Sequence, residues 1–225
     1  MTRTLIFVIV DLFVIFVLTA SAQARRPSVP RVEASFGVGF SSGSDLGERD
    51  ATLLDRNGAP YLLFATSSQL TSSVPIEGRL GYAITPRYAI EARGVWSRPE
   101  LRTSISQDVE GAPPVVASER IDQYQLEGSF VVMLDRLRFH GVAPFASGGV
   151  GWVGQVHEEY TLIEHGISYR GGGGLKYRLS SRDRGFVRGV GIRADAGFVV
   201  MTKGIESDGG ASHRAEVSGS IYLVF

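Results

Sequence analysis

The sequence predicts an all-β fold, an eight-stranded antiparallel up-and-down transmembrane β-barrel preceded by a cleavable signal peptide. Three observations lead to this prediction. Apolar and polar residues alternate in eight separate segments, which is the period of a β-strand. Longer and shorter connections alternate between these segments, as they do in membrane barrels. The last segment ends on Phe225, the final residue, and pairing it with the first strand would leave no exposed sheet edge.

The N-terminus has the pattern of a signal peptide. Arg3 supplies a positive charge, and an apolar stretch follows at 5–18. Two small-x-small patterns come next, which predict signal cleavage after Ala22 or Ala24. We therefore assign 1–24 to the signal peptide.

An uncleaved membrane anchor is the alternative for this segment. The apolar stretch is short, and Asp11 would cost about 2.5–3.5 kcal/mol near the centre of a membrane helix. No cysteine follows, so attachment as a lipoprotein is excluded. The mature chain should begin near Arg25, with the outer-membrane barrel domain at 31–225.

Composition excludes several classes of function. The 225 residues contain 23 basic and 23 acidic residues and no cysteine. A balanced charge argues against nucleic acid as a partner, because phosphate binding needs clustered positive charge. Without cysteine there are no disulfides, thiolate metal sites or thiol nucleophiles.

The eight alternating segments each have about the 9–11 residues with which a tilted strand crosses a membrane. They cover 31–40, 76–84, 88–97, 123–134, 143–156, 167–179, 190–200 and 215–225. The longer connections at 41–60, 107–119, 157–166 and 202–214 are predicted as polar outer loops. A short apolar stretch at 61–64 either extends a strand above the membrane or packs under a loop. The segment at 88–97 could continue toward Ile105.

Charge is confined to one face of these segments. The polar rows hold six acids and six bases, and we expect them to form an ion-pair network in the lumen: Glu33, Glu77, Glu91, Glu127, Asp195 and Glu216 with Arg79, Arg93, Arg170, Lys176, Arg178 and Arg193. In a soluble barrel such charges would face water, whereas in a membrane barrel they face the lumen. Alternation alone does not separate these two arrangements.

Two features favour the membrane arrangement. Aromatic residues fall at two levels, as expected at the two membrane interfaces. These predicted interface residues are Trp96, Tyr124, Trp152 and Tyr169 at one end and Tyr82, Tyr88, Tyr177 and Phe225 at the other. The apolar rows also contain small residues such as Gly171 and Gly173, which would fill a soluble core poorly.

An eight-stranded barrel is only wide enough to be filled by its own side chains. Isolated charges in such a lumen would be costly, so the balanced set should pair internally. The alternative is a pore lined by these charges.

The pattern resembles the small outer-membrane β-barrel superfamily, which includes the membrane domain of outer-membrane protein A. The resemblance rests on the signal peptide, the eight strands, the Gly-rich segments 144–151 and 171–177, and the terminal IYLVF at 221–225. It implies that the terminal strand ending in Phe225 is read by the barrel-assembly machinery. The sequence stops at the barrel, so we do not expect the wall anchoring of outer-membrane protein A.

Three motifs point to other chemistry only weakly. The glycines of 149–154 match the spacing of a dinucleotide-binding loop, but they lie inside a strand pattern with no helix after it. His157 and His165 share one predicted loop and could bind metal, although a solvated loop is the simpler interpretation. Ser212 and His213 are adjacent in a strand-flanking segment, so they should point to opposite faces and make a poor catalytic pair.

We therefore expect an integral protein of a Gram-negative type outer membrane with a structural or surface-interaction role. It should be a monomer, have no enzymatic activity, cofactor or metal, and contact outer-membrane lipids and the assembly machinery. The alternatives are a narrow channel, a lipid-modifying membrane enzyme and a soluble periplasmic lipid-binding barrel.

Overall fold

The computed structural model describes residues 32–54, 56–107, 109–110, 112–157, 163–182, 185–202 and 211–225. The predicted signal peptide at 1–24, with its cleavage positions Ala22 and Ala24, lies outside the described residues. Within the described ranges, no helix has the length and apolar character needed to cross a membrane.

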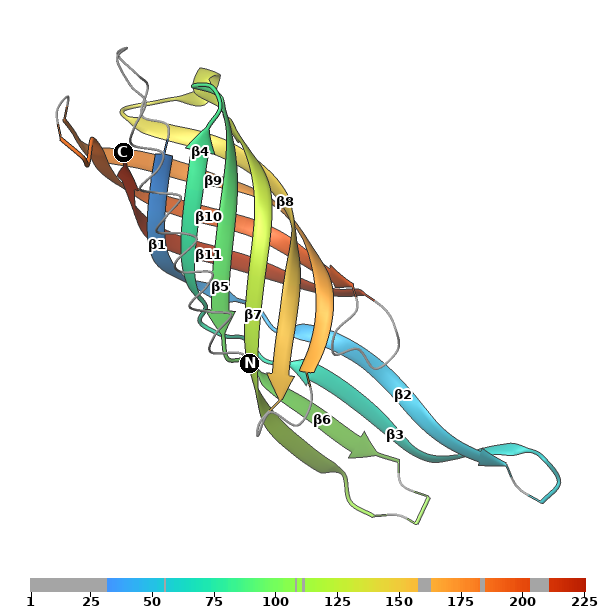
Figure 1. Ribbon diagram of the computed structural model, residues 1–225. Helices are drawn as coiled ribbons and strands as arrows, with labels where there is room; N and C mark the ends of the chain where they lie inside the picture. Colours follow the sequence, from blue (N-terminus) through green and yellow to red (C-terminus); the bar gives the residue numbers. More distant parts are fainter. Residues whose placement is uncertain are drawn as a thin grey trace.

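Eight strands close into an antiparallel ring, which confirms the predicted all-β architecture (Figure 1). The ring runs in the order β1, β4, β5, β7, β8, β9, β10 and β11. Their bounds are β1 Val32–Ser41, β4 Ile76–Ala83, β5 Tyr88–Ser97, β7 Val115–Met133, β8 Val142–His157, β9 Ile163–Ser181, β10 Gly189–Thr202 and β11 Ala211–Val224. β1 closes the ring by pairing with β11, from Glu33 opposite Val224 to Ser41 opposite Glu216. A closed ring pairs backbone groups between strands, which is a requirement for crossing a membrane.

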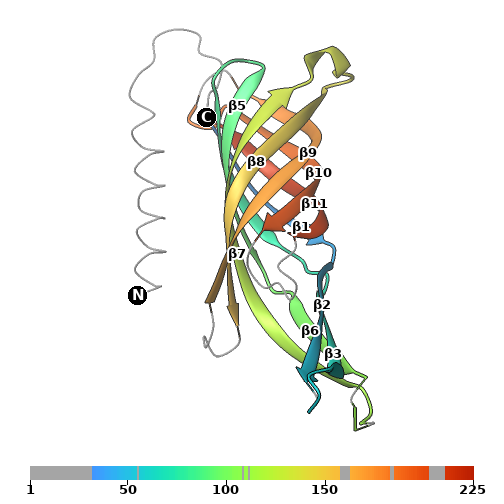
Figure 2. The same cartoon turned by 90° about the vertical axis from the view of Figure 1, so that its right-hand side faces the viewer.

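Three further strands form a sheet that projects beyond one end of the ring (Figure 2). They are β2 (Ser44–Leu54), β3 (Pro60–Leu70) and β6 (Glu100–Ser106). β6 pairs with the first part of β7, so the fourth strand of this sheet is a ring strand that continues outward. We call β2, β3, β6 and the part of β7 from 115 to 120 the extension sheet.

The extension sheet corrects the prediction of polar loops at 41–60 and 107–119. β2 lies in the first of these segments, and β7 begins within the second. The sequence pattern missed the strands because both faces of this sheet are largely open to water, so no apolar row marks them. The apolar stretch at 61–64 belongs to β3, so it extends a strand beyond the ring.

The predicted continuation of 88–97 toward Ile105 occurs as β6, after a break at Arg98 and Pro99. Pro99 has no backbone N–H to donate, but its carbonyl accepts a hydrogen bond from the Ile121 backbone at 3.0 Å. Ser97 lies opposite Gln123 and Glu100 lies opposite Arg120, so β5 and β6 keep one register along β7. This continuity makes the extension sheet an outgrowth of the barrel wall.

The ring is apolar outside and charged inside. Phe198 is 73% exposed and Ile221 is 60% exposed, whereas Arg193 is 2% exposed and Glu77 is 1% exposed. This is the reverse of a soluble barrel, in which the apolar rows would form the core. The predicted assignment of the two faces therefore holds along the ring strands.

The two ends of the ring differ. The start of β1 and the end of β11 lie together at one end, which we call the inner end (Figure 1). The β4–β5 turn and the β7–β8 turn, with its 3-10 helix η2 (Asp135–Leu137), lie at the same end. The extension sheet rises from the opposite, outer end.

Candidate functional site

The middle of the lumen is filled by charged side chains that alternation places on the inner face of the ring. Ten of them are buried: Glu77, Glu91, Glu127, Asp195, Glu216, Arg79, Arg93, Arg170, Arg193 and Arg214. Five carboxylates thus meet five guanidinium groups. Their formal charges cancel, as burial in a narrow lumen requires.

Two arginines organise the half of this cluster nearer the inner end. Arg79 contacts Glu77 and Asp195 at 2.8 Å each, and Glu91 at 3.3 Å. Arg193 contacts Glu91 at 2.5 Å and Asp195 at 2.9 Å. Two carboxylates are therefore shared between two guanidinium groups, and each group has several charged hydrogen-bond partners.

Arg93 organises the other half. It contacts Glu77 at 2.8 Å, Glu216 at 3.1 Å and Glu127 at 3.4 Å. Glu216 is also held by Arg214 at 3.1 Å. Because Glu77 binds both Arg79 and Arg93, the two halves form one continuous network.

Glycines on the same inner face make room for these long side chains. At Gly149, an added Cβ would lie 2.9 Å from a carboxylate oxygen of Glu127 and 2.6 Å from the Gly128 carbonyl oxygen. A larger residue could not be placed there without moving the backbone. This is a packing reason for the Gly-rich strands.

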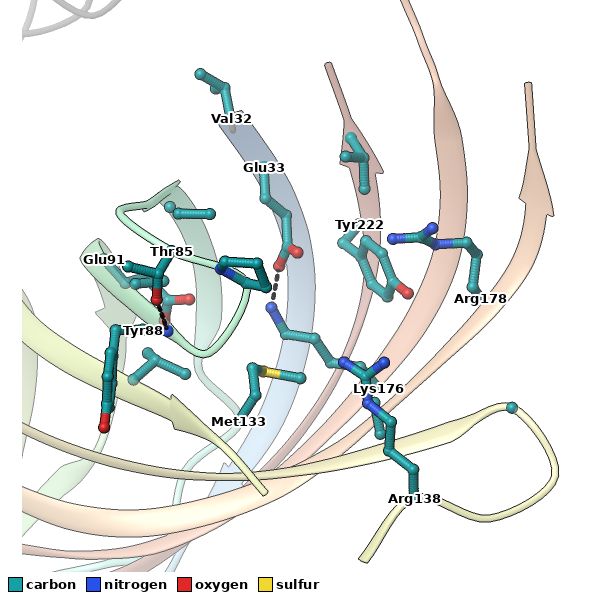
Figure 3. Close-up of a pocket in the computed structure, with 18 residues that line it drawn as sticks. Val32, Glu33, Thr85, Tyr88, Glu91, Met133, Arg138, Lys176, Arg178 and Tyr222 are labelled. Carbon is teal, nitrogen blue, oxygen red and sulfur yellow. Dashed lines mark hydrogen bonds and ion pairs between the residues drawn. The ribbon is translucent and has the colours of Figure 1, made fainter. Parts of the chain in front are cut away.

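Of the twelve lumen residues expected from the sequence, eleven form ion pairs with one another. In the remaining pairs, Lys176 contacts Glu33 at 2.6 Å, and Arg170 lies 3.8 Å from Glu216. The twelfth, Arg178, has no carboxylate within ion-pair distance among the described residues and lies beside Tyr222 at the inner end (Figure 3). Arg214 was missed because it fell in a predicted loop.

The outer part of the lumen is filled by uncharged side chains. The side-chain amides of Gln155 and Gln123 lie at a hydrogen-bonding distance of 3.1 Å. An apolar cluster of Val153, Val199 and Met201 lies on the same inner face. A second cluster, Leu46, Leu70 and Ile121 with Leu101 against it, packs where the extension sheet leaves the ring. The ion-pair network and these uncharged side chains together occupy the lumen between its middle and its outer end.

The inner end of the lumen is open. A cavity of about 500 Å³ lies there and is bounded by residues from the ring strands and two turns (Figure 3). Lys176, Arg178, Tyr222 and Glu33 lie on one side, and Met133 lies on another.

The predicted interface aromatics lie at the two ends of the ring, on its outer face. At the outer end Trp96 lies opposite Tyr124 on the neighbouring strand. The other outer-end residues, Trp152 and Tyr169, are on β8 and β9. The inner-end residues are Tyr82, Tyr88, Tyr177 and Phe225. Phe225 packs against Phe186, with ring centroids 5.0 Å apart.

The residues of the weak motifs are not brought together. His157 contacts Glu119 at 3.0 Å, while His165 packs against Trp152 on the outer face. Ser212 is buried in the lumen and His213 is exposed on the other face. The glycines of 149–154 lie within β8. Among the described residues, no group of three or more His, Asp or Glu is placed to hold a metal ion.

No protein-family model matches the chain, and no curated protein matches it. Among solved structures, the chain is similar to the outer membrane protein OprG from Pseudomonas aeruginosa, with 11% identity, a TM-score of 0.44 and coverage of 89% of this chain and 96% of that one. It is also similar to the outer membrane protease OmpT from Escherichia coli, with 9% identity, a TM-score of 0.40 and coverage of 91% and 99%. These similarities assign no residue of this chain a role.

Proposed function

We propose that the chain is an integral outer-membrane β-barrel protein with a structural or surface-interaction role, and that it presents the extension sheet outside the cell. The inverted ring is the observation that carries this proposal. Large apolar side chains cover its outside, and a neutral cluster of buried charges fills its inside. In water the apolar outside of the ring would be exposed, and nothing would favour burying the charges. In a bilayer the apolar side chains contact lipid and the charges stay in the lumen.

The extension sheet supports an interaction role. Its far end exposes apolar side chains that neither the ring nor a membrane would cover. Leu54 is 69% exposed and Val116 is 63% exposed, and Tyr61 is also exposed. Leu53 lies opposite Tyr61 on the neighbouring strand and both are exposed, and an exposed apolar pair outside the ring is suited to contact with another molecule.

A narrow channel is disfavoured by the packing of the lumen. The middle is occupied by the ion-pair network, and uncharged side chains fill the lumen above it. A lipid-modifying enzyme is disfavoured because Ser212 and His213 point to opposite faces. We accordingly propose no catalytic residue.

The aromatic residues at the two ends of the ring would contact the membrane interfaces. Their outward position on the wall and their two levels suit this role. Phe225, at the end of the closing strand, would be the group that the barrel-assembly machinery reads. We propose that the protein works as a monomer, since the ring is closed by its own chain.

Labelling of single cysteines tests the location and the orientation. The chain has no cysteine, so each introduced thiol is unique. Ser67→Cys lies on the extension sheet and its matched control Ser180→Cys lies at the inner end, and both positions are exposed. A membrane-impermeant maleimide should label Ser67→Cys in intact cells and Ser180→Cys only after the outer membrane is permeabilised. The reverse pattern would contradict the orientation, and equal labelling of both in a soluble extract would contradict the membrane location.

The channel alternative has its own test. Purified protein in planar bilayers should show no steady conductance, because the described side chains fill the lumen between its middle and its outer end. Reproducible single-channel steps that change when Arg93 is replaced would favour the channel.

A further inference from the structure

The cavity at the inner end exists because the lumen residues there are small on four neighbouring strands. At mid-height these strands place Arg79, Arg93 and Glu127 in the lumen. Nearer the inner end the corresponding inward positions hold short or apolar side chains: Gly81, Ala83, Ala89, Val131, Met133 and Ala143. The lumen therefore widens toward the inner end, and this part of its wall is mostly apolar. Arg138 of the β7–β8 turn also lines the cavity and pairs with Asp135 at 2.9 Å.

The other half of the wall is polar and cationic. Lys176 and Arg178 are two residues apart on β9, so both face the lumen. Lys176 is largely buried, and its Nζ lies 5.6 Å from the centre of the Tyr222 ring. Arg178 lies at the rim beside Tyr222 (Figure 3).

The Tyr222 ring occupies space that a glycine on the neighbouring strand leaves free. A Cβ at Gly191, on the neighbouring strand, would clash with the ring and hydroxyl of Tyr222. The ring therefore lies over the glycine and forms a flat part of the cavity wall. This arrangement places an aromatic surface next to both cations.

The charges in the cavity leave one cation without a carboxylate. Glu91, at the floor, is held by Arg193 at 2.5 Å and by Arg79 at 3.3 Å. Glu33 pairs with Lys176 at 2.6 Å. Among the described residues no carboxylate lies within ion-pair distance of Arg178, whose exposed side chain lines the open end of the cavity.

We propose that this cavity binds a small organic anion that has an apolar body. The anionic group would lie between Arg178 and Lys176, and the apolar body would lie against Val131, Met133 and the alanines. The volume of about 500 Å³ falls within the range of small-molecule sites, and the combination of an apolar wall with few polar groups is typical of them. A carboxylate and a phosphate monoester offer the same contacts, so both belong to the proposed class.

This site is separate from the surface role of the extension sheet, because it lies at the opposite end of the ring. The ion-pair network fills the lumen between them. The ligand would enter and leave through the inner end. Failure of either proposal leaves the other in place.

Titration calorimetry on the full chain in phosphatidylcholine nanodiscs tests the proposal. The probes are hexanoate and hexyl phosphate, with hexanol and hexylamine as neutral and cationic matches. We expect saturable binding of at least one anion, with hexanol and hexylamine at least about ten-fold weaker, since each lacks the charged hydrogen bonds to Arg178. Comparison of the two anions shows which anionic group the site prefers.

Three variants locate the binding. Arg178→Gln should weaken it by about ten-fold, because this replacement removes the charge and leaves other pairs intact. Ala89→Phe should abolish it by filling the cavity, and Ala83→Leu serves the same purpose if that variant does not fold. Arg102→Gln removes an equal charge from the extension sheet and should leave the affinity unchanged.

Each protein is first checked for a folded barrel by its mobility in gels with and without boiling. The proposal is overturned if neither anion binds saturably, or if hexanol binds as tightly as the anions. It is equally overturned if Arg178→Gln and the cavity-filling variant bind as the unchanged protein does.

Discussion

Replacement of Arg93 by methionine tests the ion-pair network in the lumen. The Arg93 side chain is buried and contacts Glu77, Glu127 and Glu216 at 2.8–3.4 Å. Methionine keeps part of its volume but removes the charge, which leaves the lumen with one uncompensated carboxylate. Removing one partner of a buried ion pair costs about 3–5 kcal/mol. Arg93→Met should therefore lower the free energy of unfolding by about 3–5 kcal/mol, a large share of the roughly 5–15 kcal/mol of a typical domain.

The three carboxylates around Arg93 should not lose equal amounts of stabilisation in this variant. Glu77 keeps Arg79, and Glu216 keeps Arg214 at 3.1 Å. For Glu127, Arg93 is the cation within ion-pair distance among the described residues. Adding Glu127→Gln to Arg93→Met should restore part of the stability, because the double variant has a neutral lumen again.

Urea titration of the protein in lipid vesicles, followed by the gel mobility of the folded form, measures these differences. Arg102→Met is the matched control. Arg102 pairs with Glu100 at 2.8 Å on the exposed extension sheet, where such a pair contributes at most about 1 kcal/mol. Equal losses for Arg93→Met and Arg102→Met would refute the buried network, and so would a double variant that is less stable than Arg93→Met alone.

Three further variants test other parts of the structure. Ala196→Arg, on the outer face of the ring, should cost about 2–4 kcal/mol in vesicles, whereas Ser67→Arg on the extension sheet should be nearly neutral; equal small costs would contradict the lipid-facing assignment. Gly191→Ala should cost about 1–3 kcal/mol in urea titration because its Cβ clashes with the Tyr222 ring, while Gly219→Ala, with nothing within 4 Å of its Cβ, should be close to neutral; the opposite order would disprove the packing argument. Phe225→Ala should reduce the amount of assembled barrel in the outer membrane by western blot, and Phe186→Ala, which removes its ring partner, should not; unchanged assembly of the first variant would count against recognition of the terminal residue.

The ring could be predicted from the sequence because its two faces meet two different environments. Along β10, for example, Ile192 faces outward and Arg193 faces the lumen, and this alternation continues through the strand. Every ring strand carries the same contrast over about ten residues. A pattern of that length is difficult to produce in any other structure.

The extension sheet could not be predicted in the same way. β2 and β3 have water on both faces over much of their length, so a contrast between their two faces is not needed. Their strands are specified by pairing with each other and with β6. The sequence shows this only as a polar segment with one apolar stretch at 61–64.

The lumen residues were predicted as a set, but their partners were not. Alternation places Arg79 and Asp195 on the inner face, yet they are 116 residues apart in the chain and meet across the lumen at 2.8 Å. Such contacts depend on the stagger of the strands around the ring, which alternation does not determine. Arg214 was missed because the closing strand starts at Ala211, although it continues the inward row of Glu216.

The cavity was not predicted, because it depends on which small residues come to the same height. Gly81, Ala89 and Ala143 lie on three strands, and each is unremarkable in its own segment. Only the closed ring brings them together opposite Lys176 and Arg178. The position of the cavity at one end of the lumen also depends on the stagger of the strands around the ring.

Cell fractionation followed by gel electrophoresis with and without boiling tests the membrane barrel most directly. We expect the protein in the outer-membrane fraction, with a mobility that changes on boiling because the closed ring stays folded in detergent until it is heated. A protein that appears in the soluble periplasmic fraction and runs identically with and without boiling would contradict this. In that case the apolar rows would have to form a core, and the charged rows would have to face water.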